Sequence, residues 1–215
     1  MKIHTFQGGY DQNFTYLVYE QKLESQDYIG IIIDPAVSAQ EILQFAEKNN
    51  IKILFVVIMH SHFDHLVDLD IYLKKGISIY AHKSIHKEIA SKITKKINNN
   101  EIINLDKLKF KVIYTPGHEK DCICLLLENS GNKSLPSYLF TSDTLFIGSY
   151  GRVDLPGSNV TEMADSLEHI KQLPDDTIIM PGHDYGDKKQ STLGEEKEKN
   201  TFMKVSKKEF IEYYD

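Results

Sequence analysis

Short apolar runs recur along the chain, and most of them end at a proline, a glycine or an aspartate. Runs of this length that are rich in β-branched and aromatic side chains predict β-strands. We expect strands at residues 14–20, 28–35, 53–59, 109–116, 121–128, 138–143 and 177–182.

Between these strands, apolar positions recur at the three- and four-residue spacing of a helix face. This spacing predicts helices over residues 38–49, 66–73, 84–97 and 161–173. Ser38 and Glu41 have the spacing of a capping box, and Glu162 places a carboxylate in the first turn of a helix that begins at Thr161. The interleaving of strands and helices predicts an α/β protein.

Two polar segments are interpreted as parts of a single domain and not as domain boundaries. Residues 129–137 are interpreted as an exposed hairpin connection, and residues 188–212 as one or two solvated helices packed on the body. The length of 215 residues favours a single domain over residues 1–215. A chain of this size buries about 70% of its extended surface, enough for a core without disulfides or metals.

Composition excludes several classes of protein. With 25 basic and 31 acidic side chains the net charge is −6, which argues against a nucleic-acid partner. The longest apolar stretch, residues 53–59, is too short to span a bilayer. Only two cysteines, Cys122 and Cys124, are present, so there is no disulfide framework. We expect a soluble, cytoplasmic protein that binds neither nucleic acid nor membrane.

A dense group of metal-binding side chains follows the apolar run at residues 53–59. The motif HSHFDH places His60, His62, Asp64 and His65 within six positions. A single histidine is more often a core or surface residue than a ligand, but this density reverses the expectation. Imidazole and carboxylate groups bind zinc and ferrous iron. The motif therefore predicts a metal site.

Three more candidate ligands each follow a later strand. His118 ends the motif TPGH, Asp143 ends TSD, and His183 ends PGH. In α/β proteins, functional groups gather at the carboxyl ends of strands. We expect these three side chains to join the HSHFDH motif.

The series HSHFDH, TPGH, SDTLF and PGHDYG, in this order over residues 53–184, resembles the metallo-β-lactamase superfamily. Within it the series is similar to the glyoxalase II branch and its shorter relatives. The resemblance implies a four-layer αββα sandwich, in which two mixed β-sheets lie face to face with helices outside. It also implies a two-metal site along one edge of the sheets.

The resemblance assigns each ligand a role. The first metal is expected on His60, His62 and His118, the second on Asp64, His65 and His183, with Asp143 as the bridge. Two cations roughly 3.5–4 Å apart need a shared anion, which a bridging carboxylate and a bridging hydroxide supply. We expect two divalent ions, zinc first, with iron or manganese as alternatives because histidine and aspartate accept all three.

The sequence departs from its relatives at several positions. True β-lactamases usually use a cysteine at the second metal, so the resemblance does not extend to antibiotic hydrolysis, and Cys122 and Cys124 fit buried apolar positions better. Ser142 and Asp121 stand where relatives often carry glycine. Glyoxalase II also has a helical C-terminal domain that binds glutathione. Residues 184–215 are too few to form one, so we expect a short form without this domain.

Three residues are candidates for substrate binding. Arg152 is the only arginine, and its guanidinium could anchor an anionic substrate; an ion pair with Asp154 or Asp165 is an equally weighted alternative. Tyr150 and Tyr185 lie beside ligand loops and could line the pocket. Partial burial with a hydroxyl at the surface is the alternative for both.

The resemblance implies hydrolysis of a small thioester by a metal-bridging hydroxide, with Asp64 and Asp143 as the catalytic carboxylates. The alternative is a persulfide dioxygenase in which one iron is held by His60, His118 and Asp143. Seven ligands together argue against an inactive scaffold, and the acidic, compact chain argues against an RNA nuclease. Relatives occur as monomers and homodimers, and the sequence does not choose between these states.

Overall fold

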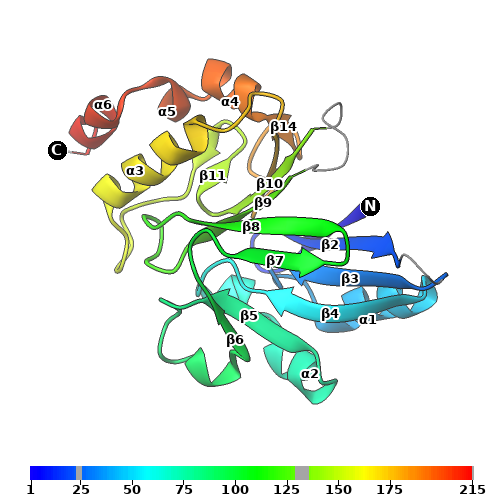
Figure 1. Ribbon diagram of the computed structural model, residues 1–215. Coiled ribbons are helices and arrows are strands. Elements are labelled where there is room, and N and C mark those ends of the chain that lie inside the picture. The colour runs from blue at the N-terminus through cyan, green and yellow to red at the C-terminus, as the bar shows by residue number, and fades with distance from the viewer. Residues whose placement is uncertain (23–25, 129–135, 215) are drawn as a thin grey trace.

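Two six-stranded β-sheets lie face to face in the computed structural model, which describes residues 1–22, 26–128 and 136–214 (Figure 1). The first sheet has the order β1 (Lys2–Gly8), β2 (Asn13–Gln21), β3 (Tyr28–Ile33), β4 (Ile51–Val57), β5 (Ser78–His82) and β6 (Lys95–Ile97). The second has the order β14 (Ser191–Thr192), β13 (Ile178–Pro181), β10 (Tyr138–Ser142), β9 (Ile123–Leu127), β8 (Leu108–Tyr114) and β7 (Ile102–Leu105).

Both sheets are mixed. In the first, β2 pairs antiparallel with β1 and β3, and the strands from β3 to β6 run parallel. In the second, β10 and β13 are parallel and the other pairs are antiparallel. A two-stranded hairpin, β11 (Leu145–Phe146) and β12 (Ser149–Tyr150), follows β10.

Helices cover the outer face of each sheet, as Figure 1 shows. They are α1 (Ala39–Lys48), α2 (Leu69–Lys74), α3 (Val160–Lys171), α4 (Leu193–Lys199), α5 (Thr201–Lys204) and α6 (Lys207–Glu212). Ile42 of α1 and Tyr72 of α2 pack on the first sheet, and Leu167 of α3 packs on the second. The expected αββα sandwich is confirmed.

The main core lies between the sheets, where the inward positions of strands from both sheets meet. Phe14 of β2, Phe110 of β8 and Phe140 of β10 are among its fully buried side chains. Truncation of such a phenylalanine to alanine costs about 3–5 kcal/mol because a cavity is left behind. This apolar centre fixes how the strand ends that carry the candidate ligands face one another.

The helix predicted over residues 84–97 is wrong. Its place is taken by a loop, a 3₁₀ turn at Ala90–Lys92 and strand β6, which pairs with β5. Thr94 explains the local choice: its hydroxyl accepts from Ile79 N at 2.8 Å and donates to Ile79 O at 3.0 Å. These tertiary bonds outweigh the helical spacing of the isoleucines.

Helix boundaries also differ from the sequence expectation. Ser38 precedes α1, but its side chain makes no capping bond; Asp68 accepts from Ala39 N instead, at 3.0 Å. Helix α3 begins at Val160, and Asn159 caps it by accepting from Glu162 N. The predicted helix at residues 66–73 is the shorter α2, and the polar C-terminal segment forms α4, α5 and α6.

Three further expectations concern the cysteines, the hairpin connection and the membrane. Cys122 and Cys124 are free and buried, as expected. Of the predicted hairpin connection, residues 129–135 lie outside the described part of the chain. Among the described helices, none has both the length and the apolarity needed to cross a membrane.

Candidate metal centre

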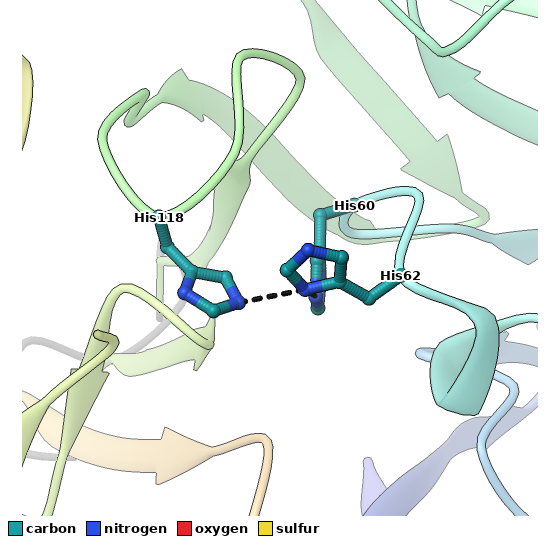
Figure 2. Close-up of side chains that lie close together, drawn as sticks. All are labelled: His60, His62 and His118. Carbon is teal, nitrogen blue, oxygen red and sulfur yellow. Dashed lines mark hydrogen bonds between the residues drawn. The ribbon is translucent and has the colours of Figure 1, made fainter. Parts of the chain in front are cut away.

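The HSHFDH motif lies where the chain leaves the carboxyl end of β4. Strand β4 ends at Val57, and a 3₁₀ turn at Phe63–His65 changes the direction of the chain within the motif. Figure 2 shows the rings of His60 and His62 on one loop facing the ring of His118 on another. Residues from two distant parts of the sequence therefore converge on one point.

The first ligand cluster consists of three histidines. His60 Nε2 lies 3.2 Å from His62 Nδ1, and His118 Nε2 lies 2.8 Å from the same nitrogen. One nitrogen from each ring is within 4.8 Å of the other two, which suits a shared metal ion. The grouping predicted for the first metal is present.

The second cluster contains Asp64, His65 and His183. His65 Nε2 lies 3.0 Å from His183 Nε2 and 3.3 Å from Asp64 Oδ2. His183 Nε2 and Asp64 Oδ2 are 3.6 Å apart. The grouping predicted for the second metal is therefore also present.

Asp143 follows β10 and lies between the two clusters. Its Oδ2 is 3.5 Å from His118 Nε2 and 3.3 Å from His183 Nε2, and its Oδ1 is 3.4 Å from His65 Nε2. Oδ1 is buried and accepts no hydrogen bond within the described residues. A buried carboxylate oxygen without a donor fits a cation, so the donor set is suited to binding metal.

The second nitrogen of four histidine ligands faces an oxygen atom. His118 Nδ1 donates to Arg152 O at 2.8 Å, and His183 Nδ1 donates to Asp11 O at 2.7 Å. His65 Nδ1 lies 2.9 Å from Asp34 Oδ2, and His60 Nδ1 lies 3.2 Å from Ser142 Oγ. Such partners orient the ring and direct the free Nε2 to the metal position.

The electrostatics of the site differ from one candidate ligand to another. Burial lowers the pKa of His60 and His62, which keeps both imidazoles neutral. Burial alone would raise the pKa of Asp143, but the neighbouring His65 and His60 outweigh it and hold that pKa well below its usual value. Burial works against a charge on His65 too, yet Asp34 and Asp143 raise its pKa well above the usual value. The carboxylates therefore create a position that attracts positive charge.

Comparison with known proteins identifies the family. The sequence profile of the metallo-beta-lactamase superfamily matches residues 11–183, which include both clusters and Asp143. The chain belongs to the metallo-β-lactamase superfamily.

Several members of this superfamily are similar to the chain. A hydroxyacylglutathione hydrolase of Dictyostelium discoideum is 33% identical over 177 residues, which cover 80% of this chain and 62% of that protein. The chain thus spans less than two thirds of that relative. Among solved structures, ETHE1 from Myxococcus xanthus superposes with a TM-score of 0.83 at 24% identity, over 99% of this chain and 89% of that one. TTHA1623 in a di-iron-bound form has a TM-score of 0.74 at 24% identity, over 93% and 99%.

Two residues that contact the ligands were missed in the sequence. Asn13 is buried and its Nδ2 donates to Asp64 Oδ2 at 2.8 Å; with His65, it helps to lower the pKa of Asp64 to about 2 against the effect of burial. Asp34, which faces His65, ends the apolar run of β3 and so follows the same strand-end rule as Asp143. That signal could have found Asp34, whereas nothing in the sequence distinguishes Asn13.

Ser142 and Asp121, the two departures noted in the sequence, both contact residues of the site. Ser142 has φ +44°, a left-handed conformation that favours glycine, and its Oγ donates to Asp34 Oδ2 at 2.6 Å. Asp121 is buried, and its Oδ1 accepts from Ser61 N at 3.3 Å, inside the HSHFDH motif. Both side chains therefore form hydrogen bonds that hold the loops carrying candidate ligands in place.

The three candidate substrate residues lie in different surroundings. The guanidinium of exposed Arg152 makes two bonds to Asp154, of 2.7 and 2.8 Å, so this ion pair is the alternative that the structure contains. Asp165 instead pairs with Lys207.

The tyrosines differ from each other. Tyr185 stacks on the ring of His183 with centroids 4.6 Å apart and is 47% exposed, a position beside the second cluster. Tyr150 is buried against Phe202 and Phe210, and its hydroxyl contacts Tyr214. Substrate contact by either tyrosine stays a prediction.

Proposed function

We propose that this chain is a metal-dependent hydrolase that cleaves a small thioester at a two-metal centre. The observation that carries the proposal is the position of Asp143, whose carboxylate approaches histidines of both clusters. The hydroxyacylglutathione hydrolase of Dictyostelium supports a thioester as the substrate class. That relative is longer than this chain, so the thiol portion is left open.

Two divalent ions, zinc by preference and iron or manganese otherwise, would provide a nucleophile near neutral pH and polarise the thioester carbonyl. His60, His62 and His118 would hold one ion, and Asp64, His65 and His183 the other. Asp143 would supply negative charge to both ions. Asp64, fixed by Asn13, also offers an oxygen that accepts a hydrogen bond from the attacking group.

Substrate binding is proposed for residues at the rim of the centre. Tyr185 stacks on His183, and Arg152 could hold an anionic group if it leaves Asp154; a contact from Tyr150 would require movement of Tyr214. Tyr10 and Phe63 are both more than 70% exposed, and their rings touch edge to face at 5.3 Å. Because Phe63 lies between two ligands in sequence, we include an apolar acyl group in the proposal.

The proposal also covers the kind of substrate and the location of the protein. We propose a small-molecule substrate, because a net charge of −6 disfavours the binding of a polyanion. The cytoplasm is the proposed location, in keeping with a chain that contains only two cysteines.

A persulfide dioxygenase is the second candidate. His60 Nε2 and His118 Nε2 lie 4.0 and 3.5 Å from Asp143 Oδ2, so two histidines and one carboxylate are available for a single iron. The likeness to ETHE1 concerns the fold. The complete second cluster favours the two-metal hydrolase.

Thiol release without oxygen separates the two functions. Protein purified without chelators is given a panel of acyl thioesters under anaerobic conditions, and thiol is measured with a chromogenic disulfide. We expect release by the wild type and loss of release in Asp143→Asn. Asp165→Asn, a change of the same kind at an exposed site on α3, should keep wild-type activity. No thiol release, together with oxygen consumption on glutathione persulfide, would overturn the hydrolase and favour the dioxygenase.

A further inference from the structure

The β11–β12 hairpin lies between Asp143 and Arg152, and the segment from Asp143 to Arg152 contacts one candidate ligand of each cluster. The ring of Phe146 packs edge-on against His183 at 5.7 Å between centroids. Just after the hairpin, the carbonyl of Arg152 accepts the hydrogen bond from His118 Nδ1. The position of this hairpin therefore affects the bridging carboxylate and one histidine of each cluster.

Two buried side chains from the C-terminal segment hold the tip of the hairpin. Glu196 on α4 accepts from Gly148 N through Oε2 at 2.8 Å. Asn200, which follows α4, donates from Nδ2 to Ser149 O at 3.0 Å and to Glu196 Oε2 at 3.1 Å. Glu196 is 3% exposed and Asn200 is 1% exposed.

The bonding of Glu196 is directed at the hairpin and its own segment. Its second oxygen, Oε1, accepts from Ser191 Oγ at 2.5 Å, so both oxygens are used. The nearby lysines Lys188 and Lys199 pair instead with the adjacent Glu195. A buried carboxylate that accepts from a backbone N–H makes a strong, directional bond.

We propose that Glu196 and Asn200 are positioning residues for the metal centre. They fix the turn of the β11–β12 hairpin, and through it the orientation of Asp143, His118 and His183. The inference rests on the metal centre of the proposed function, but it holds for a hydrolase and for a dioxygenase alike.

The test compares Glu196→Gln and Asn200→Ser with the wild type and with Glu195→Gln. Glutamine keeps the size of Glu196 but places an NH₂ group against one of its donors. In the wild type, Asn200 Oδ1 accepts a hydrogen bond from Phe202 N at 3.1 Å. Serine keeps an oxygen that can accept this bond, but it lacks the amide group that reaches Ser149. Glu195→Gln makes the same chemical change one residue away, in a side chain that pairs with Lys188 and Lys199 and not with the hairpin.

Co²⁺ is the probe, because its visible absorption reports ligand geometry independently of activity. Affinity is measured by chelator competition, and unfolding by denaturant is followed on the same samples. We expect Glu196→Gln and Asn200→Ser to bind Co²⁺ about tenfold more weakly, with a changed spectrum in the folded protein. Glu195→Gln should match the wild type.

Folded variants with wild-type Co²⁺ affinity and spectrum would overturn the positioning role. Failure of both variants to fold would also overturn it, because the residues would then support the fold as a whole. A wild-type protein that binds no Co²⁺ would contradict the proposed metal centre itself. That outcome differs from one in which the wild type and both variants bind Co²⁺ equally well, which would contradict only the positioning role.

Discussion

His118 Nδ1 and the carbonyl oxygen of Arg152 lie 2.8 Å apart, so the only arginine of the chain contacts a candidate metal ligand through its backbone. Its guanidinium turns outward to Asp154. The hydrogen bond from His118 fixes its ring tautomer and leaves Nε2 free for a metal. Orientation of His118 thus depends on the path of the chain and not on the arginine side chain.

Arg152→Ala is therefore expected to keep metal affinity within a factor of about two, since an exposed ion pair contributes little. If the guanidinium anchors an anionic thioester, KM rises for that substrate while kcat is unchanged. Chelator competition and steady-state kinetics on anionic and neutral thioesters measure the two effects. His118→Ala should lose the first metal; a comparable loss in Arg152→Ala would contradict the backbone role.

Asp34 is expected to support the metal centre through His65. Asp34→Asn removes the charge that faces His65 Nδ1, and asparagine tolerates the left-handed φ of +60° at this position. We predict metal affinity about 10–100-fold below the wild type, the usual effect of losing an outer partner of a ligand. Asp68→Asn is the matched control because Asp68 also has a left-handed φ, of +56°, but caps α1. Equal affinities in the two variants would count against this role.

Ser142 combines a strained backbone with a useful hydroxyl. Ser142→Ala loses the bond to Asp34 and keeps the φ of +44°, whereas Ser142→Gly loses the bond and relieves the strain. Glycine should therefore give a free energy of unfolding about 1 kcal/mol higher than alanine does. Denaturant unfolding of the two variants checks the order, and a more stable alanine variant would show that the backbone is not strained.

The alternation of strands and helices could be predicted from the spacing of apolar residues. The four-layer arrangement was implied by the resemblance to the superfamily and not by that spacing. Long buried strands such as β4 and β8 carry that signal clearly. Strand β6 does not: Ile85, Ile89, Ile93 and Ile97 have helical spacing, and only pairing with β5 and the bonds of Thr94 decide the structure. Local pattern fails where long-range hydrogen bonds compete with it.

The convergence of the seven candidate ligands could also be predicted, since each follows a strand or belongs to one motif. Their division into two groups was implied by the resemblance. Their outer partners could not be predicted. Asn13 precedes the ligands by many residues and has no distinguishing neighbour, and the contact of Arg152 uses its carbonyl, which every residue has. Such partners depend on the path of the folded chain.

His82 should make stability depend on pH. It is buried beside Tyr114, and burial lowers its pKa to about 4. The unfolded chain, with a histidine pKa of about 6.5, binds this proton first, so the free energy of unfolding falls as pH drops from about 6.5 to 4. Above about pH 6.5 His82 is neutral in both states and contributes no pH dependence.

His82→Gln removes this effect. The stability of the wild type relative to the variant should rise with pH across that window and then level off, as measured by urea unfolding at a series of pH values. His86→Gln, the same substitution at an exposed position, is the matched control. A constant difference between the wild type and His82→Gln would contradict the prediction.

Metal content tests the central claim most directly. Mass spectrometry on protein purified without chelators, combined with thioester hydrolysis on the same sample, counts the ions that accompany activity. The position of Asp143 between the two clusters predicts about two divalent ions per chain with thiol release, and fewer ions without release in Asp143→Asn. One iron per chain with no thiol release would contradict the two-metal hydrolase.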